Sequence, residues 1–263
     1  MFAKNTDRAV GLARVLSKLG YCSRSQAAEL IRAGRVRLNG RVPRDPESPV
    51  HMGRDHVTVD GNPVEARPHI YLMMNKPRGL VTTASDENGR ETVYRLLEEL
   101  GYALPWVAPV GRLDKASEGL LLLTNDSEWG ARAAAPETHL EKRYHVQIGT
   151  LANEELIRKL QRGVSDREML RARSVHLLRS GEKNCWLEIV LDEGKNRQIR
   201  RMMDALGIDV LRLVRVAIGP LQLGTLAKGE VRQLTAKEKE VLDRSMQAKN
   251  SYHEGHKGPR RKP

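Results

Sequence analysis

The sequence predicts an α+β protein in two parts, a small basic module followed by a larger domain with a mixed, mainly antiparallel sheet flanked by helices. The first part combines apolar residues at helical spacing with tight-turn dipeptides. The second part holds strand-like and helix-like segments that do not alternate strictly, which is typical of α+β domains. At its centre, four consecutive leucines (120–123) end at the turn signal Asn125-Asp126. Such a run indicates a strand buried on both faces.

Two short helices open the basic module. Gly20 ends the first, whose inward face follows the helical spacing Leu12, Val15, Leu16 and Leu19. Ser23 and Gln26 have the spacing of a capping box and begin the second helix, which Gly34 ends. Its expected inward residues are Ala27, Leu30 and Ile31.

Short strands follow the two helices. Residues 35–38 alternate as a strand, and Asn39-Gly40 is a strong signal for a two-residue hairpin turn. Asp60-Gly61 predicts a second hairpin. Pro63 and Pro68 bracket the expected linker to the larger domain.

The larger domain begins near residue 70. Its expected strands are Tyr71–Met74, the leucine run, Arg143–Ile148, Ala172–Leu178, Trp186–Leu191 and a set between Leu211 and Leu234. Its expected helices are one with the apolar face Val93, Leu96, Leu97 and Leu100 ended by Gly101, a short one at 128–134, one capped by Asn153, one opened by Asn196 and ended by Gly207, and one boxed by Thr235 and Glu238.

We therefore expect a flexible arm at 1–10, the basic module with its linker at 11–69, the larger domain at 70–244, and a disordered basic tail at 245–263.

Composition points to a polyanionic partner. The 263 residues include 45 Lys and Arg against 33 Asp and Glu, a formal charge of +12. Because no apolar run approaches the ~18 residues of a membrane span, nucleic acid is favoured over membrane. Met1–Val10 has no apolar core and does not resemble a signal peptide. Cys22 and Cys185 are isolated, which favours a reducing cytoplasm, and histidine spacing predicts no metal site.

The basic module is charged almost entirely with one sign. Between residues 11 and 44, eight cationic residues stand against Glu29 alone: Arg14, Lys18, Arg24, Arg32, Arg35, Arg37, Arg41 and Arg44. A merely soluble surface usually mixes signs. The segment resembles an S4 RNA-binding domain (αL-type), on residues 23–28, 30–36 and Val42. The resemblance implies binding to structured RNA through its phosphates.

A second resemblance covers the larger domain. Gly111-Arg112-Leu113-Asp114, with the following residues up to Asp126, resembles the central motif of pseudouridine synthases of the RsuA type, shared with the RluB and RluF groups. Three further segments agree in order: Asn75–Gly79, Glu141–Tyr144 and Glu193–Met202. Ala116-Ser117 departs slightly from the family pattern, which more often has a polar residue and threonine. An isolated R-L-D tripeptide would more often be an ordinary turn, but this context favours a catalytic aspartate.

The resemblance implies conversion of uridine to pseudouridine in ribosomal RNA by flipping of the target base. It implies that Asp114 is the catalytic carboxylate, either attacking the ribose or promoting glycal formation. Tyr144 would stack on the flipped base, unless it is an ordinary strand tyrosine. Arg200 would pair with Asp114, or else contact a phosphate. Arg112 would fill the space that the base leaves, and Lys76 and Lys195 would act as support or RNA contacts.

The isomerisation requires no cofactor or metal, because no electron or group is gained. We expect a cytoplasmic monomer acting on ribosomal RNA or a ribosomal assembly intermediate. One alternative is an inactive, S4-containing ribosome-binding or assembly factor. A different residue at position 114 or 144 would have favoured this alternative, but Asp114 and Tyr144 are both present. Action on messenger or transfer RNA is a third and remote alternative.

Overall fold

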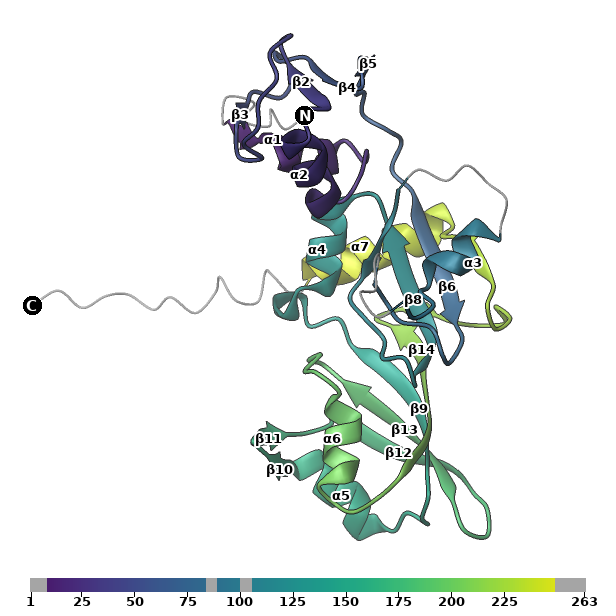
Figure 1. The fold of residues 1–263 in the computed structure, drawn as a ribbon. Coiled ribbons are helices and arrows are strands. Elements are labelled where there is room, and N and C mark those ends of the chain that lie inside the picture. Colours follow the sequence, from purple (N-terminus) through teal and green to yellow (C-terminus); the bar gives the residue numbers. More distant parts are fainter. Residues whose placement is uncertain (1–8, 84–88, 100–105, 249–263) are drawn as a thin grey trace, which may run out of the picture. The chain divides into compact units, whose positions relative to one another are not determined.

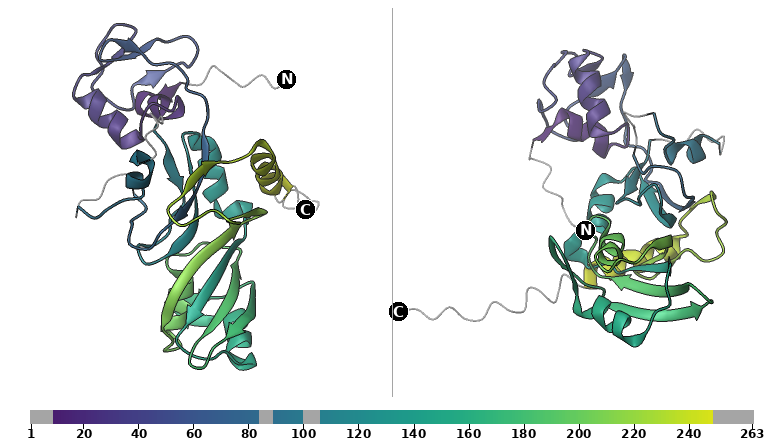
Figure 2. Two further views of the ribbon diagram at one scale, coloured as in Figure 1. Left: turned by 90° about the vertical axis from the view of Figure 1, so that its right-hand side faces the viewer. Right: turned by 60° about the horizontal axis from the view of Figure 1, so that its bottom comes forward.

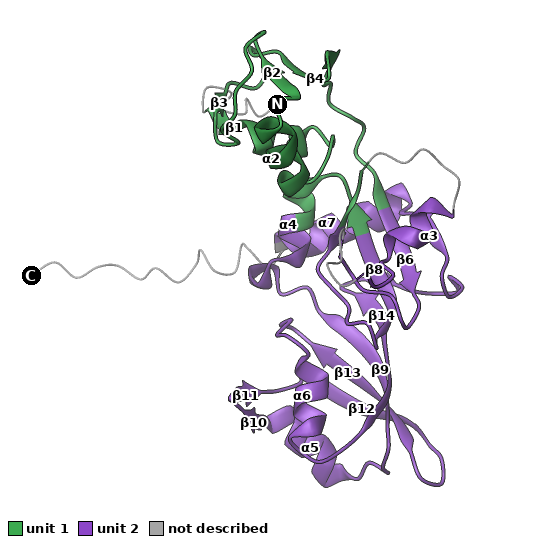
Figure 3. Cartoon of the chain, viewed as in Figure 1, with its two compact units in different colours: residues 1–71, 102–108, 123–130 green, residues 72–101, 109–122, 131–263 purple. Residues whose placement is uncertain are grey.

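The computed structural model describes residues 9–83, 89–99 and 106–248 (Figure 1). They divide into two compact units (Figure 3). Of the described residues, unit 1 comprises 9–71, 106–108 and 123–130, and unit 2 the remainder. Most of unit 1 is the N-terminal module, and the two later segments are grouped with it.

Unit 1 contains the two predicted helices, α1 (Leu12–Lys18) and α2 (Arg24–Arg32). The Ser23 hydroxyl accepts a hydrogen bond from the Gln26 backbone N–H, and the Gln26 side chain accepts one from the Ser23 N–H, each at 3.0 Å. The capping box is confirmed. Leu12, Leu16 and Ile31 are fully buried in the small core of the unit.

The strands of unit 1 form two small sheets. One pairs β1 (Val10–Gly11) with β3 (Pro49–Val50), and the other has the order β2 (Val36–Leu38), β4 (Val57–Val59), β5 (Asn62–Pro63). The turn at Asn39-Gly40 forms, with positive φ at both residues, but β2 pairs mainly with β4 and the turn closes only a single bridge. Val10 lies in a strand, so the predicted arm ends before it.

Unit 2 contains most of a nine-stranded sheet. The main order is β12 (Ser174–Ser180), β13 (Cys185–Leu191), β9 (Lys142–Ile148), β14 (Val210–Ile218), β8 (Glu118–Thr124), β6 (Tyr71–Lys76), β16 (Val231–Gln233). Two short strands join it: β7 (Ala108–Val110) pairs with β8, and β15 (Leu221–Gln222) pairs with β14. Tyr71 of β6, Ala108 of β7 and the last two residues of β8 are assigned to unit 1. β14 runs parallel to β8 and antiparallel to β9. The predicted mixed, mainly antiparallel sheet is confirmed.

The leucine run forms the predicted strand. All seven residues of β8 are buried, and Leu120, Leu121 and Leu123 have no exposed surface. Gly119 allows β14 to approach closely, because a Cβ there would lie 2.3 Å from the Arg215 carbonyl oxygen and its φ is +101°. The loop before β8 is therefore held against a rigid sheet.

The helices of unit 2 mostly follow the predictions. They are α3 (Tyr94–Glu98), α5 (Glu154–Arg162), α6 (Gln198–Asp204) and α7 (Ala236–Ala248), together with a 3-10 turn at Pro136–Thr138; α4 (Ser127–Ala134) spans the division between the units. The Asn153 cap and the Thr235–Glu238 box form as expected. Leu100 and Gly101, the expected end of α3, lie outside the described residues.

Two predictions about unit 2 need correction, and one hairpin was missed. Arg197, with a φ of 48°, and not Asn196, is the N-cap of α6. α7 continues to Ala248 and buries Met246, so the predicted disordered tail begins too early at Ser245. The hairpin of β10 (Val164–Asp166) and β11 (Glu168–Leu170) was not predicted.

Candidate active site

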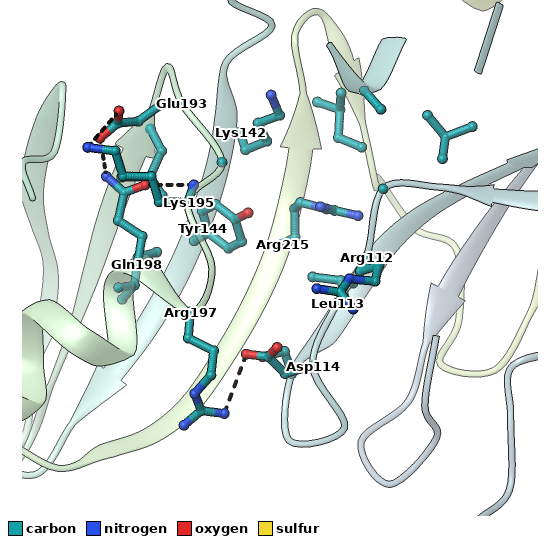
Figure 4. A pocket seen from close by; sticks show the side chains of 18 of the residues that line it. Arg112, Leu113, Asp114, Lys142, Tyr144, Glu193, Lys195, Arg197, Gln198 and Arg215 are labelled. Atoms are coloured by element: carbon teal, nitrogen blue, oxygen red, sulfur yellow. Dashed lines mark hydrogen bonds and ion pairs between the residues drawn. The ribbon is translucent and has the colours of Figure 1, made fainter. Parts of the chain in front are cut away.

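A cavity of about 410 Å³ in unit 2 brings together the central predicted residues (Figure 4). Asp114 reaches it from the loop before β8, Tyr144 from β9, and Arg197 from the start of α6. Tyr144 packs its ring on the core of unit 2. These three residues are separated by 30 to about 80 positions in the sequence. They come close together in the fold because strands β9, β14 and β8 are neighbours in the sheet.

Asp114 forms an ion pair with Arg197, whose Nη1 lies 3.7 Å from Asp114 Oδ2. The predicted partner, Arg200, donates instead from Nη2 to the Ala116 carbonyl oxygen at 3.0 Å. Burial and the neighbouring Arg197 charge lower the pKa of Arg200, while the Asp114 charge acts in the opposite direction. Arg200 is thus influenced by the carboxylate but binds its loop. The predicted ion pair is corrected to Arg197–Asp114.

The backbone around Asp114 is fixed by hydrogen bonds to five successive carbonyl groups. Thr82 Oγ1 donates to Leu113 O at 2.7 Å, and Gly79 N–H donates to Lys115 O at 2.8 Å. Arg200 holds the next carbonyl, and Lys76 donates to those of Asp114 and Ser117 at 3.1 and 2.8 Å. A loop held in this way presents its carboxylate in one position, which lowers the entropic cost of reaching a reactive geometry.

Lys76 has no exposed surface. Burial lowers the pKa of Lys76 to about 8, although the nearby Asp114 and Glu118 charges oppose the shift. Besides the loop, its ammonium donates to the carbonyl of Pro77 at 3.1 Å. The support role is the one that fits this geometry. The expectation of a direct RNA contact by Lys76 is wrong, because RNA cannot reach a fully buried amine.

Deprotonation of Lys76 should loosen the loop, because a neutral amine has two protons for three carbonyl acceptors. We expect the single-turnover rate to fall as the pH rises through about 8. Stability should change in the opposite direction. Between pH 8 and 10.5 the unfolded chain binds the proton that the folded chain has released, so the unfolding free energy contributed by this group rises with pH. Pre-steady-state rates of wild type and Lys76→Met, measured across this pH range, test the expectation. If the rate of Lys76→Met fell with rising pH in the same way as that of wild type, the expectation would be contradicted.

Arg197→Met should lower the rate constant of the chemical step about fivefold, since a half-exposed ion pair contributes at most about 1 kcal/mol. Arg197→Lys should recover most of this loss, because a contact at 3.7 Å requires a point charge rather than a bidentate fork. Single-turnover kinetics of the two variants check the expectation. A lysine variant as slow as the methionine variant would show that charge is not what Arg197 supplies.

Two further predicted residues also line the cavity. Arg112 is exposed at its rim. Lys195 lies 3.1 Å from Glu168 and 3.3 Å from Glu193, and its hydrogen bond to Glu168 raises its pKa. Lys195 is therefore engaged by two carboxylates within the protein, which favours support over RNA contact.

Arg215 and Arg197 line the cavity but were not among the predicted site residues. Arg215 on β14 is 5% exposed; its Nε donates to Leu120 O at 2.7 Å, and its Nη2 has no partner among the described residues. Its signal in the sequence is a single arginine inside an apolar strand. Gln198, also buried, donates to Arg171 O and Glu193, and so fixes the turn that presents Arg197.

The six basic residues predicted to bind RNA through the S4-like module differ in availability. Lys18 pairs with Glu128 at 2.6 Å, and Arg35 donates from Nε to Asp60 at 2.9 Å, so their charges are partly neutralised. The other four are exposed on α1, α2 and β2: Arg14, Arg24, Arg32 and Arg37.

Within the described residues, no group of three or more His, Cys, Asp or Glu side chains is placed to hold a metal ion. In the same part of the chain, no helix combines the length and apolar character that crossing a membrane requires.

Comparison with known proteins agrees with this architecture. A family model described as RNA pseudouridylate synthase matches residues 70–205, and an S4 domain model matches residues 10–56. The ribosomal large subunit pseudouridine synthase B of Bacillus subtilis is 35% identical over 230 residues, covering 86% of this chain and 93% of that protein. An uncharacterized RNA pseudouridine synthase of Aquifex aeolicus is 35% identical over 231 residues, covering 87% and 92%.

A crystal structure of a pseudouridylate synthase superposes with a TM-score of 0.61 at 28% identity, over 89% of this chain and 99% of that one. The fold and the matched models together define an enzyme that modifies RNA. More specifically, the chain belongs to the RNA pseudouridylate synthase family, in the RsuA/RluB/RluF type that carries an N-terminal S4 domain.

Proposed function

We propose that this enzyme converts a specific uridine of ribosomal RNA to pseudouridine, with Asp114 acting at the glycosidic bond of a flipped-out nucleotide. The observation that carries the proposal is the Asp114 carboxylate, paired with Arg197 in a cavity that Tyr144 also lines. The Bacillus subtilis relative named for the large ribosomal subunit supports ribosomal RNA as the substrate.

The proposed chemistry breaks the bond between ribose C1′ and uracil N1 and joins the same C1′ to uracil C5. Asp114 either attacks C1′, forming an ester bond that breaks when C5 bonds to C1′, or takes the C2′ proton to give a glycal and returns it when C5 bonds to C1′. In both routes a carboxylate near C1′ stabilises the developing positive charge of the sugar. The C5 proton is then lost and N1 gains one, so no redox partner is required.

Each neighbouring group has a place in this proposal. The Tyr144 ring stacks on the flipped base, and its hydroxyl helps to move the C5 proton. Arg112, at the rim, fills the space that the base leaves in the RNA. Arg197 forms the ion pair with Asp114, and Arg200 and Lys76 hold its loop.

The decisive experiment is to map pseudouridine in ribosomal RNA from cells with and without this protein, and then to restore the modification with purified enzyme and transcribed rRNA. We expect the loss of at least one pseudouridine, recovered by wild type and not by Asp114→Asn. An unchanged map would contradict the choice of ribosomal RNA.

The S4 module should bind RNA electrostatically. Replacing the exposed Arg14, Arg24, Arg32 and Arg37 with glutamine should flatten the dependence of log affinity on log salt by roughly 0.7–0.9 for each phosphate that is no longer neutralised. Binding titrations of one rRNA fragment at several salt concentrations measure this slope. Replacing Arg158, which pairs with Glu154 on α5, provides a control that also removes a positive charge. Equal slopes for the quadruple variant and wild type would mean that these residues do not neutralise phosphates.

A further inference from the structure

The outer face of the sheet formed by β12, β13, β9 and β14 has no role in the proposed chemistry. Helices α5 and α6 lie against the other face of these strands (Figures 1 and 2), where Val146, Leu187 and Leu213 are buried in the core. Side chains alternate along a strand, so the neighbouring positions point outward. In the described part of the chain, the outward-pointing Arg143 and His176 are exposed, on the side opposite the helix that presents Arg197.

One row of residues crosses this face. Arg179 pairs with Trp186, Trp186 with Gln147, and Gln147 with Arg212 in the strand register. The Arg179 guanidinium carbon lies 5.0 Å from the centre of the Trp186 ring, and that of Arg212 lies 5.5 Å from it. Both guanidinium groups are close enough to the indole for cation–π attraction, which orients the ring.

A hollow of about 330 Å³ lies next to the indole. Its lining combines apolar and polar groups: His145, Leu178, Arg179, Trp186 and Val214. Its size falls at the low end of the range for small-molecule sites. Leu178, which lines it, is 46% exposed. An exposed leucine next to an oriented indole is suited to a flat, partly apolar group.

The charges around the hollow favour an anionic chain. Glu188 lies 3.8 Å from Arg143 and 3.6 Å from His145, so these groups largely balance. Glu118 binds both Arg212, at 3.1 Å, and Lys228, at 2.6 Å, which leaves one positive charge in excess. Arg179 has no carboxylate partner among the described residues. The surroundings of Trp186 therefore carry unneutralised positive charge.

We propose that this hollow is a second RNA site, in which an unpaired base of the substrate RNA stacks against Trp186 while Arg179 and Arg212 contact the flanking phosphates. Stacking on an aromatic ring between arginines is a sequence-tolerant way of binding single-stranded RNA. The inference rests on the proposed function in that it takes RNA as the partner. It adds that the enzyme binds an unpaired RNA segment on the face opposite the cavity, away from the reacting uridine.

The test measures binding of a labelled short oligoadenylate to the full chain. This RNA contains no uridine, so it reports binding without turnover. Trp186→Ala should weaken affinity roughly 5- to 150-fold, the range expected when one base–aromatic stack is removed. Trp186→Phe should retain most of the affinity, because a ring remains. Arg179→Ala should lower the salt slope by about 0.7, whereas Arg158→Ala on the helical face should not.

A second measurement separates this inference from the proposed function. With the rRNA substrate, Trp186→Ala should raise the RNA concentration for half-maximal rate and leave the single-turnover rate at saturation nearly unchanged. A wild-type enzyme that forms no pseudouridine in rRNA would contradict the proposed function, while the oligoadenylate titration would still decide the second site. Equal affinities of wild type, Trp186→Ala and Arg179→Ala for oligoadenylate would overturn the second RNA site. This result is expected if the face binds a protein instead.

Discussion

Replacing Asp114 with asparagine should abolish pseudouridine formation. The substitution keeps the size of the side chain and the backbone hydrogen bonds from Lys76 and Ser117, but removes the negative charge that the proposed step requires at C1′. Affinity for RNA should stay within several-fold of wild type, because phosphate contacts elsewhere dominate binding. Single-turnover assays with a saturating rRNA fragment measure the rate constant, and equilibrium binding to the same fragment measures the affinity.

The matched control for Asp114→Asn is Asp209→Asn, which removes an exposed carboxylate outside the cavity lining. This variant should retain the wild-type rate. If Asp114→Asn formed pseudouridine near the wild-type rate, Asp114 could not be the catalytic carboxylate. If both variants were inactive and both unfolded at a urea concentration lower than that for wild type, the loss of activity would reflect reduced stability.

Removing the Tyr144 hydroxyl should slow the chemical step by about 10²–10⁴-fold, the usual contribution of a positioned acid or base. In Tyr144→Phe the ring still packs on the core of unit 2, so stacking and RNA affinity should persist. The measurement is the single-turnover rate at saturating RNA. Tyr21→Phe is the control, since Tyr21 lies in unit 1, with Arg67 over its ring. A wild-type rate for Tyr144→Phe would leave Tyr144 with stacking alone.

Local signals in the sequence determined most of the elements. The four leucines predicted a strand buried on both faces, and β8 is buried throughout. The cap at Asn153 and the boxes at Ser23 and Thr235 marked helix starts correctly. These predictions succeed because the hydrogen bonds of a cap and the periodicity of an element depend on residues only a few positions apart.

The partner of Asp114 was decided by tertiary structure. Helical periodicity places both Arg197 and Arg200 near the start of α6, and the motif alone favoured Arg200. The left-handed backbone at Arg197, with the buried Gln198 behind it, turns the Arg197 side chain toward the carboxylate. A single residue at positive φ changes the direction of the chain, and no periodic pattern encodes this.

The sequence by itself determined the α+β fold class and the family, and it predicted Asp114 and Tyr144 as site residues. Only the tertiary structure decided the roles of the cations. A lysine is usually exposed, but Lys76 is fully buried, because it donates to carbonyl groups 38 and 41 residues away. Arg215 and Trp186 likewise gain their surroundings from strands that meet only in the folded sheet. Contacts between distant residues depend on how strands pair, and that pairing is a property of the whole chain.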